Sequence, residues 1–61
     1  MIKDTNNKVY KTTDKVQSVD IEENTYFINI TLTDATNYRY VYPLGEWLAK
    51  DLIKRNILEE V

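Results

Sequence analysis

Residues 26–33 hold the feature that most limits the possible folds, a strict alternation of side chains with a period of two. Apolar residues at every second position place one face of a segment in a core and the other in solvent, which is typical of a half-buried β-strand. The inner positions are Tyr26, Ile28, Ile30 and Leu32, and between them stand Phe27, Asn29, Thr31 and Thr33. The segment therefore predicts a strand with one apolar face.

A hairpin turn is predicted directly after this strand. Residues 34–37, with Asp34 first and Asn37 in the left-handed position, favour a type I turn followed by a bulge. The predicted cross-strand partners are Asp34 with Tyr38, Leu32 with Tyr40, and Ile30 with Tyr42. This register places the tyrosines on the face of the isoleucines. A loop one residue longer or shorter would move them to the opposite face.

The other segments complete a small α+β domain. Residues 9–13 predict a short edge strand, and residues 15–22 predict a strand whose broken alternation indicates a bulge. Residues 1–8 are polar and aperiodic, so we expect them to form a flexible arm. Residues 1–61 together predict one domain, in which a three- to four-stranded antiparallel β-meander packs against one C-terminal α-helix.

The helix is predicted from Pro43, which is tolerated at a first helical position, to about Arg55. One apolar stripe at helical spacing consists of Leu44, Trp47, Leu48 and Leu52. The pairs Glu46/Lys50 and Asp51/Arg55 have the i,i+4 spacing that stabilises an exposed helix face. We expect Asn56 to end the helix in the left-handed conformation, whereas its start has no capping side chain.

The size of the chain bears on its assembly. At 61 residues, with no cysteine and no histidine, it has neither a disulfide nor a thiolate or imidazole metal site to support a small core. Oligomerisation is the remaining way to stabilise a domain of this size, so we expect a homodimer. The apolar residues Ile57, Leu58 and Val61 are expected either to dock as a final strand or to make dimer contacts.

The residue types argue against catalysis. No histidine is available as a general base, and the single glycine, Gly45, cannot form a glycine-rich phosphate loop. We therefore expect no enzyme activity, no catalytic residue, no cofactor and no metal ion. No segment approaches the roughly 18 consecutive apolar residues of a membrane span, so we expect a cytoplasmic protein without a membrane partner.

Protein binding is the leading functional hypothesis. The predicted hairpin places Phe27 and Val41 on the outer face of the sheet, where an exposed apolar pair can form the centre of an interface. Nearby carboxylates would complement a partner's charge at the rim of this interface. We expect that role for Glu22, Glu23 and Asp34.

Composition adds an expectation about biological context. Asn, Lys, Ile, Thr and Tyr are frequent, whereas Gly, Pro and Trp occur once each, as in proteins from AT-rich genomes. Short chains of this kind are common in phages and mobile elements, so we expect a protein that inhibits or modulates a host enzyme by occluding it.

One alternative is a nucleic-acid-associated module that uses the strand Tyr38, Arg39 and Tyr40 with the N-terminal lysines. The net charge of the chain, −2, argues against a phosphate-binding surface. A second alternative is the structural subunit of a homo-oligomer.

Overall fold

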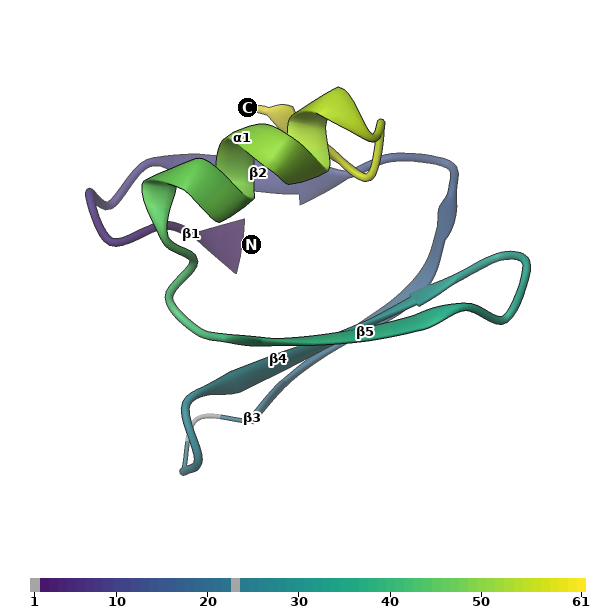
Figure 1. The fold of residues 1–61 in the computed structure, drawn as a ribbon, viewed down its shortest axis with the longest axis horizontal. Helices are drawn as coiled ribbons and strands as arrows, with labels where there is room; N and C mark the ends of the chain where they lie inside the picture. The colour runs from purple at the N-terminus through teal and green to yellow at the C-terminus, as the bar shows by residue number, and fades with distance from the viewer. Residues whose placement is uncertain (1, 23) are drawn as a thin grey trace.

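The computed structural model describes residues 2–22 and 24–61, and it confirms the α+β class. The described residues form six strands in two antiparallel three-stranded sheets and one helix near the C-terminus (Figure 1). The elements are β1 (Ile2–Lys3), β2 (Val9–Thr12), β3 (Val16–Glu22), β4 (Phe27–Leu32), β5 (Asn37–Val41), α1 (Glu46–Lys54) and β6 (Leu58–Glu60). The sheet β3-β4-β5 is the predicted meander, and β1, β2 and β6 add a second sheet that the sequence did not predict as one unit.

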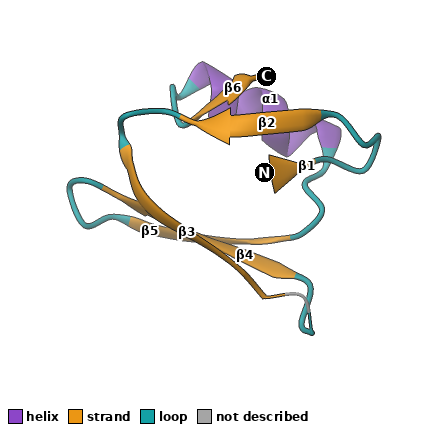
Figure 2. Cartoon of the chain, turned by 180° about the vertical axis from the view of Figure 1, so that it is seen from behind, coloured by secondary structure: helices purple, strands orange, loops and turns teal. Residues whose placement is uncertain are grey.

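The two sheets enclose the core between them. Figure 2 shows β1, β2, β6 and α1 on one side and β3-β4-β5 on the other, connected through the turn between β2 and β3. From the meander, Ile28 and Ile30 are fully buried because the alternation of β4 directs both inward. The opposite side of the core is formed by Ile2, Tyr10, Leu44, Ala49, Leu52, Ile57 and Leu58.

The β4–β5 hairpin has the predicted faces but not the predicted register. Ile30 lies opposite Tyr38, and Ile28 lies opposite Tyr40, so the partner of Ile30 is four residues before the predicted partner, Tyr42. A shift by an even number of residues leaves every side chain on its face, and the tyrosines therefore share the face of the isoleucines as predicted. The turn also differs, because Ala35, with φ 73°, occupies the left-handed position that was predicted for Asn37.

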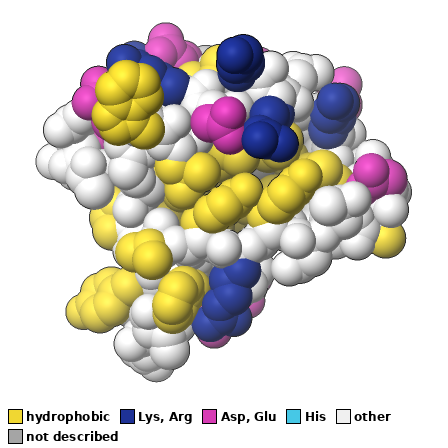
Figure 3. Space-filling view, viewed as in Figure 1, with side chains coloured by type: hydrophobic (Ala, Val, Ile, Leu, Met, Phe, Trp, Pro, Cys, Tyr) yellow, Lys and Arg dark blue, Asp and Glu magenta, His cyan; other side chains and the backbone are white. Residues whose placement is uncertain are grey.

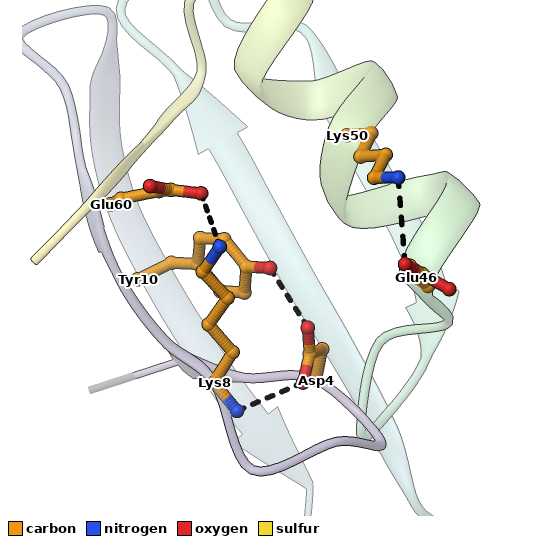
Figure 4. A network of polar contacts seen from close by, with 6 residues as sticks. All are labelled: Asp4, Lys8, Tyr10, Glu46, Lys50 and Glu60. Atoms are coloured by element: carbon orange, nitrogen blue, oxygen red, sulfur yellow. Dashed lines mark hydrogen bonds and ion pairs between the residues drawn. The ribbon is translucent and has the colours of Figure 1, made fainter.

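The N-terminal segment packs on the domain, which corrects the expectation of a flexible arm for the described residues 2–8. Ile2 pairs with Tyr10 in the first sheet, and its side chain is only 4% exposed. Asp4 is also buried, and its carboxylate accepts hydrogen bonds from the backbone N–H groups of Asn6 and Lys8 and from the hydroxyl of Tyr10. These bonds fold residues 4–8 into a tight connection between β1 and β2 (Figure 4).

The helix begins at Glu46, three residues after the predicted start, because the backbone is still extended at its N-cap, Gly45. As expected, no side chain caps this end, and Asn56 adopts the left-handed conformation just after the helix. Both predicted i,i+4 ion pairs are present. The predicted apolar stripe is wrong at two positions: Leu44 is buried but lies before the helix, and Trp47 is 84% exposed. The buried residues of α1 are Ala49 and Leu52.

Candidate functional site

The outer face of the β3-β4-β5 sheet carries an exposed apolar patch at the end where β4 begins and β5 ends. Phe27 and Val41 lie directly opposite each other in the β4–β5 ladder, as the sequence predicted for this face. Val41 is 63% exposed and Phe27 is half-buried. Tyr26, the residue before β4, is 68% exposed. We call Tyr26, Phe27 and Val41, with the neighbouring Arg39, the outer patch.

Arg39 links the aromatic part of the outer patch to the charge beside it. Its guanidinium carbon lies 4.4 Å from the centre of the Phe27 ring, within the range of a cation–π interaction. Its Nη1 atom is 3.1 Å from Oε2 of Glu22, and the side-chain amide of Asn29 donates a hydrogen bond to the same carboxylate. These contacts order Arg39 and Glu22 across the three strands. Figure 3 shows hydrophobic side chains beside basic ones at this end of the sheet.

Only part of the predicted acidic rim lies at the outer patch. Glu22 does, because it pairs with Phe27 in the β3–β4 ladder. Asp34 lies in the β4–β5 turn, at the other end of a six-residue strand, about 20 Å away at 3.3 Å per residue. There it accepts a hydrogen bond from the N–H of Thr36, and the bonds from Thr36 lower the pKa of Asp34. Glu23 lies outside the described residues.

Two exposed aromatic residues were missed by the sequence prediction. Tyr26 was predicted on the inner face of the strand, but it precedes β4 with a left-handed φ of 58°, and its side chain is 68% exposed. The turn residues just before it were the available signal, since a left-handed residue often ends such a turn. Trp47 was assigned to the core, but it lies on the outer side of α1 with Lys50 Nζ 5.6 Å from its ring centre.

The side chains of Tyr38, Arg39 and Tyr40, which the alternative of nucleic-acid binding requires together, lie on two different faces of the sheet. Tyr38 and Tyr40 are half-buried on the inner face, where their rings stack at 5.9 Å. Arg39 between them points to the outer face and is paired with Glu22. The N-terminal lysines Lys8 and Lys11 form ion pairs with carboxylates of β6. The three side chains of this strand therefore do not form one stacking platform.

The expected dimer contacts are also divided. Ile57 and Leu58 are 2% exposed within the core of this chain, because β6 docks as the final strand against β2. This corrects their assignment to an outside contact and bears out the docking alternative. Val61 is 70% exposed at the end of the same segment.

No protein-family model, no curated protein and no solved structure matches the chain. Among the residues that the structure describes, no helix is long and apolar enough to cross a membrane. Within those same residues, no group of three or more acidic side chains is placed to hold a metal ion.

Proposed function

We propose that this chain is a non-enzymatic protein-binding domain that uses the outer patch to cover a surface of its partner. The observation that carries the proposal is the pairing of Phe27 with Val41 on a solvent-facing sheet, with the Arg39 guanidinium over the Phe27 ring. Aromatic residues and arginine are the side chains most enriched at the energetic centres of protein interfaces. Tyr26, next to Phe27 in the chain, adds an aromatic side chain that is 68% exposed.

The arrangement of charge supports a protein partner over a polyanion. The arginine of the outer patch already has a carboxylate partner, Glu22, so the local charge is balanced before any ligand arrives. A partner would therefore dock mainly by burying apolar and aromatic surface, with polar contacts at the rim. The composition of the chain adds the proposal that this partner is a host enzyme, inhibited or modulated because part of its surface is occluded.

The test uses substitutions that change side chains of the outer face and leave the core intact. The chain is immobilised and used to capture proteins from a low-GC bacterial lysate treated with nuclease. The captured protein is then purified, and its affinity is measured by calorimetry. We expect Phe27→Ser and Val41→Ser each to weaken binding at least tenfold, since truncation of a hot-spot residue costs about 2 kcal/mol or more.

Trp47 provides the matched control. It is a larger and more exposed apolar side chain, but it lies on α1 and outside the outer patch. Trp47→Ser should leave the affinity for the purified partner unchanged. Equal losses for Phe27→Ser and Trp47→Ser would show non-specific adhesion and contradict the proposal, as would binding that disappears with nuclease treatment. An enzyme partner should also lose activity when the chain is added in stoichiometric amount.

Self-association belongs to the same proposal as a second kind of protein partner. The expected homodimer would use exposed residues such as Val61, because Ile57 and Leu58 are buried in the core. Light scattering over a concentration series measures the mass directly. A mass of one chain, 7.2 kDa, at all concentrations would refute the homodimer without affecting the binding of another protein.

A further inference from the structure

Among the residues that the structure describes, β3 is the longest strand, and one of its two sides has no partner strand. The sheet order is β3-β4-β5, so β3 is an edge strand of seven residues. Figure 2 shows the sheet that contains β3 below β1 and β2. Edge strands in stable proteins are often shortened or carry proline or lysine, which discourages the addition of another strand. β3 is long and contains neither residue, and its one irregularity is a bulge between Val16 and Ser18.

The hydrogen bonds of the sheet show which backbone groups of β3 face outward. In the β4–β5 ladder, Tyr42 N–H donates to Tyr26 O, so the even-numbered residues of β4 bond to β5. Antiparallel ladders alternate, and the odd-numbered residues Phe27 and Asn29 therefore bond to Glu22 and Asp20 of β3. The N–H and C=O groups of the residues between, Val19 and Ile21, point to the open side of β3.

A cavity lies beside this open edge. It has a volume of about 520 Å³, within the usual range for ligand sites, and lies between β3 and the β1–β2 pair. Its apolar lining is formed by Ile2, Tyr10, Val16, Val19 and Ile21. On the inner face of the sheet, the isoleucines of β4 are fully buried, whereas Val19 and Ile21 of β3 are only half-buried. The apolar inner face thus extends beyond the part that the other sheet and α1 cover.

We propose that β3 accepts an extended segment of another protein as a fourth, antiparallel strand of this sheet. The added strand would bond to the outward backbone groups of Val19 and Ile21. Its side chains alternate between faces, so every second one would enter the cavity. The segment recognised would therefore have apolar residues opposite Val19 and Ile21 and a polar residue between them, opposite Asp20.

The charge on β3 identifies the residue opposite Asp20 and argues against a second copy of β3. Asp20 is exposed and forms none of the ion pairs found among the described residues. A symmetric antiparallel pair of β3 strands bonded through Val19 and Ile21 would place Asp20 directly opposite its own copy, which is destabilising. A lysine or arginine at that position is stabilising instead. The recognised pattern is thus apolar–basic–apolar in an extended segment.

The experiment uses the full chain and capped heptapeptides. The probe is the peptide TVKVKVT, and the control TVEVEVT differs only in charge. Two N-methylated forms of the probe remove either the valine N–H groups, which would bond to β3, or the lysine N–H groups, which would not. Backbone amide shifts of the chain are followed by NMR at low salt, and affinities are taken from the titrations.

We expect the probe to shift the amides of Val19 and Ile21 and the residues that line the cavity. The glutamate peptide should bind roughly fivefold more weakly, as expected for reversing one cross-strand charge pair. N-methylation at the valines should abolish binding, whereas N-methylation at the lysines should leave it unchanged. The variant Asp20→Lys should reverse the preference between the two charged peptides, an effect that a loss of folding could not produce.

Three results would overturn the proposal. One is the absence of Val19 and Ile21 shifts at millimolar probe, and another is equal binding of both N-methylated peptides. The third is self-association that protects these two amides in the chain alone, which would assign the edge to a second copy. Phe27→Ser leaves the β3 edge unchanged and should retain probe binding, so failure of this proposal and failure of the outer-patch proposal can be told apart.

Discussion

The substitution Tyr10→Phe tests the buried polar contact that holds the N-terminal segment on the domain. The Tyr10 hydroxyl donates a 2.8 Å hydrogen bond to Oδ2 of Asp4, and each residue is 3% exposed. Burial opposes ionisation of Asp4. The hydrogen bonds from Tyr10 and from the backbone of Lys8 and Asn6 outweigh that effect, and the pKa of Asp4 lies below its usual value. The substitution removes one of these donors and leaves the ring packing intact.

The expected loss follows from the energetics of hydrogen bonds to charged groups. Such a bond contributes about 1.5–3 kcal/mol, so we expect Tyr10→Phe to lower the free energy of unfolding by about 2 kcal/mol. In a domain of this size, that loss corresponds to a fall in melting temperature of roughly 8–16 °C. Thermal and urea unfolding followed by circular dichroism measure both quantities. The control is Tyr26→Phe, which removes a hydroxyl from a side chain that is 68% exposed and should change neither.

The pH dependence of the folding stability is a second test of the same contact. Burial, together with the hydrogen bond to Asp4, raises the pKa of Tyr10 to about 12 from an ordinary value of 10.0. The protonated tyrosine is therefore favoured in the folded state. Its contribution to stability is complete below pH 10 and is lost as the pH rises to about 12. The pKa of Asp4 is lowered, so its contribution is present above its ordinary value of 3.8 and is lost as the pH falls below it.

Tyr10→Phe should therefore flatten the stability profile between pH 10 and about 12 and reduce the loss below pH 3.8. All other residues are the same in the two proteins, so the difference between the two profiles isolates Tyr10. A loss smaller than about 0.5 kcal/mol at neutral pH, or identical alkaline profiles, would refute the view that this hydrogen bond stabilises the fold.

Three further substitutions test the fold. Leu52→Ala removes a fully buried side chain and should cost about 2–5 kcal/mol, measured by urea unfolding; a loss below 1 kcal/mol would contradict its place in the core. Ala35→Gly should stabilise the chain by roughly 0.5–1 kcal/mol, because Ala35 has φ 73° and glycine adopts that conformation without strain; destabilisation would contradict this turn. Trp47→Ser should change stability by no more than about 0.5 kcal/mol, and a larger loss would place Trp47 in the core.

The faces of the meander could be predicted from the sequence, but its register could not. The period-two pattern determines which residues share a face, and a shift by four positions, like any even shift, preserves that pattern. The left-handed turn residue would have set the register, and by intrinsic preference it should have been Asn37. The structure places Ala35 there, where its N–H donates to Leu32 O, and pairs Ile30 with Tyr38 over the core. Packing of the inner face thus outweighs the local preference of the turn.

The helix and the N-terminal segment show two other limits of prediction from the sequence. Leu44 lies before the helix begins, so it does not belong to the helical repeat. Without it, the buried side of α1 is centred on Ala49 and Leu52, and Trp47 lies on the opposite side. At the N-terminus, the bond from Asn6 N–H to Asp4 is the local turn that aspartate often forms, and it was available as a signal. The hydrogen bond from the Tyr10 hydroxyl forms only once β1 and β2 are paired, so the sequence alone could not predict it.

The outer patch and the open edge of β3 have a common physical origin in the alternation of the meander. A three-stranded sheet has two edges and two faces, and the second sheet covers only the centre of one face, where β4 lies. The outer face leaves Val41 exposed, and the uncovered inner margin leaves Val19 and Ile21 half-buried. Glu22 pairs with Phe27 next to the edge, so a strand added to β3 would widen the face that carries the outer patch. A partner that supplies such a strand would therefore contact both surfaces, and its affinity should fall with either Phe27→Ser or Asp20→Lys, whereas the isolated heptapeptide should respond only to Asp20→Lys.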